Sequence, residues 1–237
     1  MSVIKIKKER EFKVVNKSVT VAEITLYADI GEDWWGDGSS VSARDFAKIL
    51  KDIPESVNEI QLRINSPGGD VFDGITIYNR LVQHKAKVVV YVDGMAASIA
   101  SIIALAGDEI IFGEGASMMI HKPWTRAMGN SNDILAVVDR LDEVEEQLVG
   151  IYVRKTGLDR TEIKELMAKE TWFDAQQAIE AGFADKTMET EEAINIAASL
   201  ERASWIRNKP VFNNFNDIIE KEINNCKNNI ESFLARK

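Results

Sequence analysis

Hydrophobic positions along the first half of the chain follow two different periods. Short apolar or alternating runs, typical of strands, occupy residues 22–28, 60–65, 88–92, 110–112 and 118–120. Apolar residues three or four positions apart predict helices over residues 42–52, 72–83 and 99–106. The run at 88–92 is continuously apolar, which is the pattern of a strand buried on both faces. Strands alternating with helices predict crossover connections and a mainly parallel sheet, and therefore an α/β fold.

The second half of the chain is dominated by helical patterns. Residues 133–154 form a long amphipathic stretch, and shorter helices are predicted at 161–168 and 175–181. Beyond Gly182 glycine disappears and asparagine becomes frequent, while apolar residues between 215 and 234 keep a helical spacing. We therefore expect three parts: a loosely held N-terminal arm (1–20), a main domain (20–187) and a helical C-terminal tail (188–237) that serves assembly.

One acidic, glycine-rich segment separates the first predicted strand from the first predicted helix. It spans residues 31–40 and contains Trp34 and Trp35. Ser40 at its end is the expected N-cap of the helix that follows.

Composition narrows the classes of function. The 237 residues carry a net charge of −9, with 45% hydrophobic and 28% charged residues, as in a soluble globular protein. This charge argues against a broad nucleic-acid surface. Cys226 is the single cysteine, which excludes an intrachain disulfide and a zinc site built on cysteine pairs. With no signal-peptide pattern and no apolar run of membrane-spanning length, we expect a cytoplasmic protein without membrane contact.

The candidate chemistry lies around a serine and a histidine. Ser98 falls between the buried strand and an apolar helix, and His121 ends the next apolar run. Serine becomes a useful nucleophile when a base takes its proton, and histidine is the usual base near neutral pH. The small residues Gly94, Ala96 and Ala97 before Ser98 predict a tight turn that lets a substrate approach.

Backbone amides complete this serine-hydrolase hypothesis. The free amides at a helix start favour negative charge, and Gly68-Gly69 follows a strand without side chains to obstruct a ligand. The N–H groups of Gly69 and Ile99 are therefore the candidate oxyanion hole.

Each of these features also has a structural interpretation. Ser98 is a plausible helix cap, His121 a structural hydrogen-bonding residue, and the glycine pair a simple turn. His84, the only other histidine, lies in a polar stretch and is expected at the surface. Ser101 is a weaker nucleophile candidate, because it is expected inside the helix instead of at its start.

Several motifs in order resemble one protease family. They are residues 64–69 (INSPGG), 94–98 (GMAAS), 119–123 (MIHKP), 129–134 (GNSNDI) and 173–185 (FDAQQAIEAGFAD). Over about residues 20 to 187 the chain resembles ClpP, the proteolytic subunit of the Clp protease. The resemblance implies a ClpP/crotonase-type α/β fold with a helical handle. It also implies assembly into rings, as a heptamer or double heptamer, and peptide-bond hydrolysis without metal or cofactor.

The resemblance also implies roles for individual residues. Ser98 becomes the nucleophile, His121 the general base, and the amides of Gly69 and Ile99 the oxyanion donors. Where the family has an aspartate as third member, this chain has Glu170; Asp174 is the nearest substitute, although it resembles a helix cap. The substrate is expected as an extended chain beside a strand edge, near Gly68, Met95, Trp124 and Thr125.

Two segments resemble a branch of the family. Residues 33–38 (DWWGDG) and 170–173 (ETWF) are similar to the ClpP-related head maturation proteases of tailed bacteriophages and prophages. That resemblance implies a scaffold or capsid precursor as substrate, inside a prohead in the host cytoplasm.

Three alternatives remain at this stage. One is a degradative peptidase that works with a Clp ATPase. Another is a crotonase-type enzyme acting on acyl-CoA thioesters, against which the Ser98/His121 pair argues. The third is a non-catalytic capsid-assembly component with the same fold, for which the glutamate at position 170 leaves room.

Overall fold

The computed structural model describes residues 11–33 and 38–188, which form a mixed α/β fold. The described strands are β1 (Glu11–Asn16), β2 (Val21–Tyr27), β3 (Asp29–Ile30), β4 (Ser40–Val41), β5 (Glu59–Ser66), β6 (Lys87–Ala97), β7 (Glu109–Phe112), β8 (Ser117–Ile120), β9 (Thr171–Asp174) and β10 (Lys186–Thr187). The described helices are α1 (Ala43–Asp52), α2 (Val71–Val82), α3 (Ile99–Ala104), α4 (Ser131–Thr156), α5 (Arg160–Ala168) and α6 (Ala175–Glu180).

The main sheet is largely parallel, as the alternation of strands and helices predicts. Its strand order is β1-β2-β5-β6-β7-β10, with β8 paired to β6 and β9 paired to β8. Only the β1–β2 and β8–β9 pairs are antiparallel among the described strands. Crossover helices α2 and α3 connect neighbouring parallel strands, which places the carboxyl ends of β5 and β6 at one edge of the sheet.

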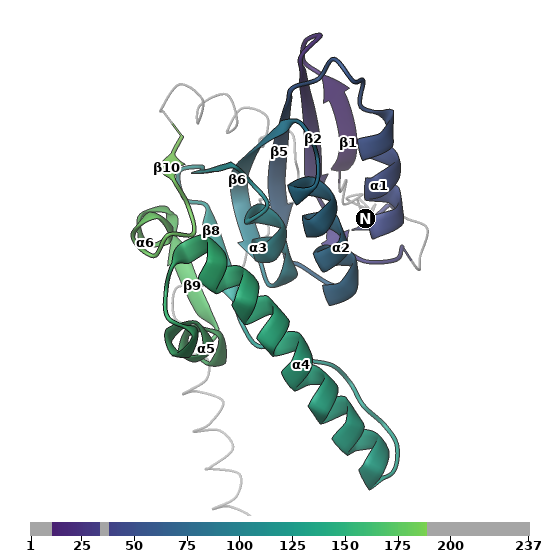
Figure 1. The fold of residues 1–237 in the computed structure, drawn as a ribbon, viewed down its shortest axis with the longest axis vertical. Helices are drawn as coiled ribbons and strands as arrows, with labels where there is room; N and C mark the ends of the chain where they lie inside the picture. Colours follow the sequence, from purple (N-terminus) through teal and green to yellow (C-terminus); the bar gives the residue numbers. More distant parts are fainter. Residues whose placement is uncertain (1–10, 34–37, 189–237) are drawn as a thin grey trace, which may run out of the picture.

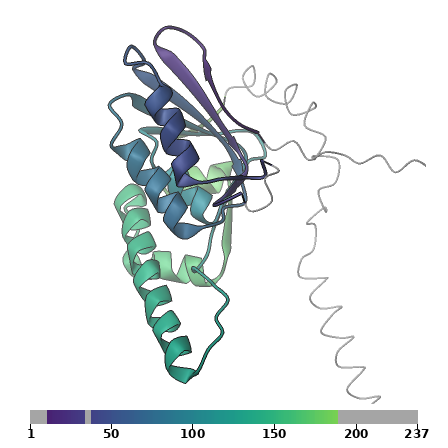
Figure 2. The ribbon, with the colours of Figure 1, turned by 90° about the vertical axis from the view of Figure 1, so that its right-hand side faces the viewer.

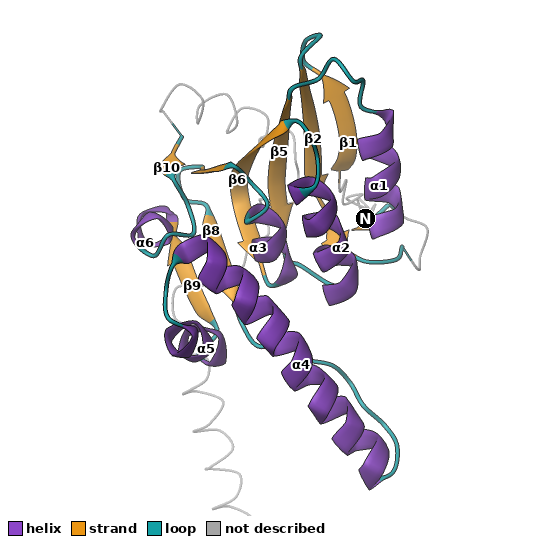
Figure 3. Cartoon of the chain, viewed as in Figure 1, coloured by secondary structure: helices purple, strands orange, loops and turns teal. Residues whose placement is uncertain are grey.

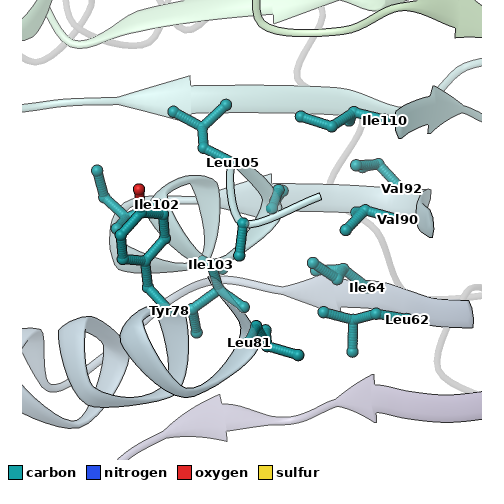
Figure 4. Packing of buried hydrophobic residues seen from close by; sticks show 14 of the residues in the cluster. Leu62, Ile64, Tyr78, Leu81, Val90, Val92, Ile102, Ile103, Leu105 and Ile110 are labelled. Carbon is teal, nitrogen blue, oxygen red and sulfur yellow. The ribbon is translucent and has the colours of Figure 1, made fainter. Parts of the chain in front are cut away.

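Helices α1, α2 and α3 pack together on one face of this sheet (Figures 1 and 2). Leu62, Ile64, Val90 and Val92 point from the strands toward the side chains of the covering helices, among them Leu81 of α2 and Ile103 of α3, as Figure 4 shows. All of them are buried, so the core between sheet and helices fixes the ends of β5 and β6 relative to α2 and α3.

Strand β6 is longer than the apolar run predicts. The predicted tight turn at Gly94–Ala97 is wrong: these residues continue the strand. Val89–Val92 pair with β7, whereas Met95–Ala97 pair with β8, so one strand serves two neighbours. Ala96 and Ala97 are buried, and their small side chains allow this close packing.

Two expectations about the N-terminal half are also corrected. The predicted loose arm at 1–20 contains β1, an antiparallel partner of β2, and Phe12 holds it to the domain by stacking on Phe46 of α1 at a centroid distance of 5.7 Å. Ser42, not Ser40, caps α1, since its Oγ accepts a hydrogen bond from the Asp45 amide. Trp34 and Trp35 lie outside the described residues, as does the predicted helical tail beyond Met188.

Helix α4 projects from the body of the molecule (Figures 1 and 3). Its C-terminal half is anchored by Val144, Leu148, Val149 and Tyr152, which are buried. Its N-terminal half carries exposed apolar side chains, and it begins with a capping box at Asn130. The long helix predicted at 133–154 is thereby confirmed, with only its second half packed on the domain.

Candidate active site

Ser98 stands at the junction of β6 and α3 in a strained backbone conformation. Its φ is 54° and its ψ is −128°, and among the described non-glycine residues only Ser98 and Glu170 have a positive φ. Such conformations cost on the order of 1–3 kcal/mol and persist where surrounding contacts enforce them. The Ser98 amide donates to the Met119 carbonyl of β8 at 2.9 Å, which helps to enforce this one.

The Ser98 side chain points to His121 and does not cap α3. Its Oγ lies 2.7 Å from His121 Nε2, and it makes no capping hydrogen bond. The helix-cap interpretation of Ser98 is therefore wrong. Parallel pairing of β6 with β8 explains the contact, because Ala97 lies opposite Met119, two residues before His121.

His121 is half-buried, and its surroundings favour the neutral imidazole. Burial lowers its pKa from the ordinary value of about 6.5, while the charge of Glu170 acts in the opposite direction. The net direction is downward, so the ring is in the form that accepts a proton at neutral pH.

Glu170 follows α5 and immediately precedes β9. The antiparallel register pairs Ile120 with Thr171, so His121 and Glu170 are the next residues along the two strands. The charge of Glu170 reaches His121, but within residues 11–33 and 38–188 no hydrogen bond joins the two side chains. Asp174, the substitute acid, caps α6 through a capping box with Gln177 and is occupied there.

Two backbone amides beside Ser98 are available to a ligand. Neither the Gly69 nor the Ile99 N–H donates a hydrogen bond to any atom of the described part of the chain. Gly69 is exposed, and its neighbours Gly68 and Asp70 bond to Ile30 of β3, which holds the glycine segment in place. Gly69 and Ile99 therefore offer unpartnered donors next to the Ser98 turn.

Gly68 is needed for close packing against that turn. A Cβ at this position would lie 2.7 Å from Ser98 Cβ and 2.7 Å from the Ala97 carbonyl oxygen, and its φ is 93°. Its own N–H and carbonyl are already bonded, to Ser66 Oγ and the Ile30 amide. Gly68 thus contributes space at the site, not a main-chain hydrogen bond for a substrate.

The remaining predicted substrate residues differ in what they offer. The Met95 amide already donates to Asn65 Oδ1 at 3.2 Å and is not free for a substrate, while its side chain is half-buried. Trp124 is 68% exposed and Thr125 is also exposed, in the coil that leads from His121 to α4. This coil begins at the end of β8 that carries His121. Among the described residues, no hydrogen bond or ring contact joins Trp124 to Ser98.

The remaining sequence candidates take structural positions. His84 is half-buried and its Nδ1 accepts the Ala86 amide, which closes the turn between α2 and β6. Ser101 is completely buried inside α3. No cluster of metal-binding side chains occurs among residues 11–33 and 38–188, and no helix there is long and apolar enough to span a membrane.

Sequence reasoning missed a buried charged group just ahead of Ser98. Arg63 makes two hydrogen bonds to Asp93, of 2.9 and 2.7 Å, and Tyr27 donates to the same carboxylate at 2.5 Å. Burial and the Asp93 charge raise the pKa of Tyr27, which stays protonated as a donor. The group ties β2, β5 and β6 together. Its only signals in the sequence are Arg63 within the predicted strand 60–65 and Asp93 directly after the predicted strand 88–92.

A substitution of Gly68 tests the packing at Ser98. We expect Gly68→Ala to lower the free energy of unfolding by about 2–4 kcal/mol, because it adds both a steric clash and a disfavoured φ. Gly115→Ala is the matched control, since its φ is 75° but nothing lies within 4 Å of the added Cβ. It should cost only about 1–2 kcal/mol in urea unfolding; equal losses would contradict the packing argument.

Comparison with known proteins identifies the fold and the family. The structure is similar to that of a single-residue mutant of ClpP1 from Listeria monocytogenes, with a TM-score of 0.62 over 73% of this chain and 94% of that one, at 22% sequence identity. That likeness establishes the fold. The profile of the family described as Clp protease matches residues 7–191, most of the chain. The chain therefore belongs to the Clp protease family and is a serine-type peptidase.

Proposed function

We propose that peptide-bond hydrolysis proceeds through Ser98, His121 and Glu170. The observation that carries this assignment is the 2.7 Å contact between Ser98 Oγ and His121 Nε2. In the first step Ser98 Oγ attacks the scissile carbonyl carbon while His121 takes the hydroxyl proton. The imidazolium then protonates the leaving amine, which departs and leaves an acyl-enzyme. Water, deprotonated by His121, attacks the acyl carbon and releases Ser98 with its proton restored.

The amides of Gly69 and Ile99 act as oxyanion donors in this proposal. Negative charge develops on the carbonyl oxygen in each tetrahedral intermediate, and preformed donors stabilise it without reorganisation. Both amides lack other partners within the described residues; Ile99 directly follows Ser98, and Gly69 follows Gly68, which packs against Ser98. Their availability supports the role.

Glu170 stabilises the imidazolium and orients its ring. Its backbone register opposite His121 and its charge at the ring support this, and its positive φ of 50° indicates a conformation held in place by the fold. The absence of a hydrogen bond to His121 in the described chain implies a small adjustment when substrate binds, as is common for catalytic hydrogen bonds.

Self-assembly into rings, as a heptamer or double heptamer, is part of the same proposal. Several large apolar side chains are exposed on the surface of this monomer. Single exposed apolar residues are normal, but groups of them indicate an interaction surface. They lie on α2, on the coil before α4 and on the first half of α4: Phe72, Val82, Met128, Ile134, Leu135 and Val138. Burial between subunits would remove these side chains from water.

For the substrate, we propose a scaffold or capsid precursor cut inside a phage prohead. The support is the resemblance of residues 33–38 and 170–173 to head maturation proteases, together with Glu170 as the third acid. The competing proposal is degradation of proteins delivered by a Clp ATPase. The two differ in their products and in their need for ATP.

A fluorophosphonate probe tests the nucleophile. We expect one adduct per chain in the wild type by intact mass, and none in Ser98→Ala, because only a serine activated by a neighbouring base reacts with such a probe. Ser101, the alternative serine, is buried and remains in the Ser98→Ala variant as an internal control. A well-folded wild-type oligomer without an adduct would contradict the assignment and favour a structural role.

The pH dependence of labelling tests His121 and Glu170. The base must be neutral, so the rate should fall as pH decreases through the lowered pKa of His121, with a midpoint below about 6.5. Glu170→Gln removes the charge that raises this pKa, so the midpoint should move further down while the plateau falls at least about tenfold.

Glu165→Gln provides the matched control for this pH profile. Glu165 lies on α5 near Glu170 but pairs with Lys169, at 3.8 Å, and should change neither quantity. An unchanged profile in Glu170→Gln would remove Glu170 from the proposed triad.

A purified capsid precursor with its scaffold segment tests the substrate. We expect the wild type to cut it at discrete sites without ATP, and Ser98→Ala to leave it intact, as read by mass spectrometry of the fragments. Short heterogeneous peptides that form only with a Clp ATPase and ATP would contradict prohead maturation and support the degradative alternative.

A further inference from the structure

A buried pair of hydroxyl groups lies directly behind Ser98. Ser101 Oγ is 2.6 Å from the Ser98 carbonyl oxygen and 2.7 Å from the Tyr152 hydroxyl of α4. Both side chains are buried, with 0% of Ser101 and 2% of Tyr152 exposed to solvent. Hydroxyl groups placed there lose their hydrogen bonds to water, so their hydrogen bonds must be satisfied within the protein.

The direction of these hydrogen bonds follows from chemistry. A carbonyl oxygen can only accept, so the single Ser101 hydroxyl proton goes to Ser98. Tyr152 must then donate its proton to Ser101 Oγ. Burial raises the pKa of Tyr152, which keeps that proton in place across the pH range of a peptidase. The result is an ordered chain from Tyr152 to Ser101 to the Ser98 carbonyl, in which each bond strengthens the next.

These two hydrogen bonds fix the peptide unit that joins Ser98 to Ile99. The Ser98 carbonyl receives a second hydrogen bond from the Ser101 amide, at 3.0 Å, so its orientation is fixed by two donors. In a planar trans peptide the following N–H points opposite to the carbonyl. Holding the Ser98 carbonyl toward Ser101 therefore aims the Ile99 N–H away from α3, to the side on which it has no partner among the described residues.

Tyr152 is itself held by aromatic packing at the anchored end of α4. Its ring meets Phe183 edge-on with centroids 5.9 Å apart, and Phe183 packs on Phe173 of β9 at 4.8 Å. Phe173 belongs to the strand that starts next to Glu170. The hydroxyl is thus presented to Ser101 by a rigid cluster that also supports the strand beside the proposed acid.

We propose that Ser101 and Tyr152 are positioning residues for catalysis. They hold the 98–99 peptide in the strained orientation that aims the Ile99 amide at the oxyanion, while touching neither substrate nor reacting atoms. The inference rests on the proposed function, in which Ser98 is the nucleophile. It assigns a role to the Ser101 hydroxyl, which sequence reasoning considered only as a weaker nucleophile.

Labelling kinetics with a fluorophosphonate separate the chemical step (kinact) from binding (KI). In Ser101→Ala we expect kinact to fall about 10- to 100-fold with KI unchanged, since losing a whole oxyanion donor costs about 100- to 1000-fold. Tyr152→Phe keeps the ring and should lower kinact about 3- to 10-fold. Because Tyr152 acts through Ser101, the double variant should match Ser101→Ala within about twofold.

Tyr78→Phe is the matched control, since it removes a tyrosine hydroxyl from the core helix α2 that takes no part in the hydrogen bonds joining Tyr152, Ser101 and Ser98. All rates are compared at a temperature where circular dichroism shows each variant folded, so a purely structural role would leave kinact unchanged. Tyr152→Phe decides the matter alone if Ser101→Ala does not fold.

Three results would overturn the proposal. Wild-type kinact in folded Tyr152→Phe would show that the hydroxyl does not position the peptide, while the proposed nucleophile would stand. Multiplying effects in the double variant would show that the two residues act independently. A wild type without a Ser98 adduct would overturn this inference together with the proposed function.

Discussion

The backbone at Ser98 is the constraint on which the active site depends. A non-glycine residue at φ 54° is unfavourable by itself and needs support from several directions. Support comes from the Met119 carbonyl on β8, the Ser101 hydrogen bonds in α3, and the absence of a side chain at Gly68. In return, this one conformation directs the Ser98 hydroxyl to His121 and leaves the Ile99 amide free.

The sheet supplies the rest of the geometry through register. Strand β6 pairs with β8 in parallel and β8 pairs with β9 in antiparallel fashion, so Ser98, His121 and Glu170 all lie just beyond paired residues. Their spacing is therefore set by main-chain hydrogen bonds and not by flexible loops. The group of Arg63, Asp93 and Tyr27 joins β2, β5 and β6, and so fixes β6 in the sheet five residues before Ser98.

The sequence predicts those parts of the fold that have a long periodic signal. Helices α1, α2 and α4 and strands β2 and β5 lie within about two residues of their predicted ranges. Strands β3, β4 and β10 have two residues each, so no period can reveal them, and they exist only through pairing with distant partners. The extension of β6 through Gly94 was missed for the same reason, because β8 and not local propensity makes it a strand.

The residues of the active site also differ in how far the sequence predicts them. Gly69, Ser98 and His121 follow β5, β6 and β8, which pair with one another in parallel, so a parallel-sheet pattern predicts that they meet at one end of the sheet. Glu170 follows a helix, and only a family resemblance suggested it. The contact of Ser101 with Tyr152 joins residues 51 positions apart across a helix packing interface, which no sequence pattern encodes.

The most direct test of this account is a crystal structure with a peptide boronate bound. A boron atom bonded to Ser98 Oγ, with one boronate oxygen about 2.7–3.1 Å from the amides of Gly69 and Ile99, is the predicted result. A boronate bonded elsewhere, or one whose oxygen faces away from both amides, would contradict the claim that the Ser98 turn forms the catalytic centre.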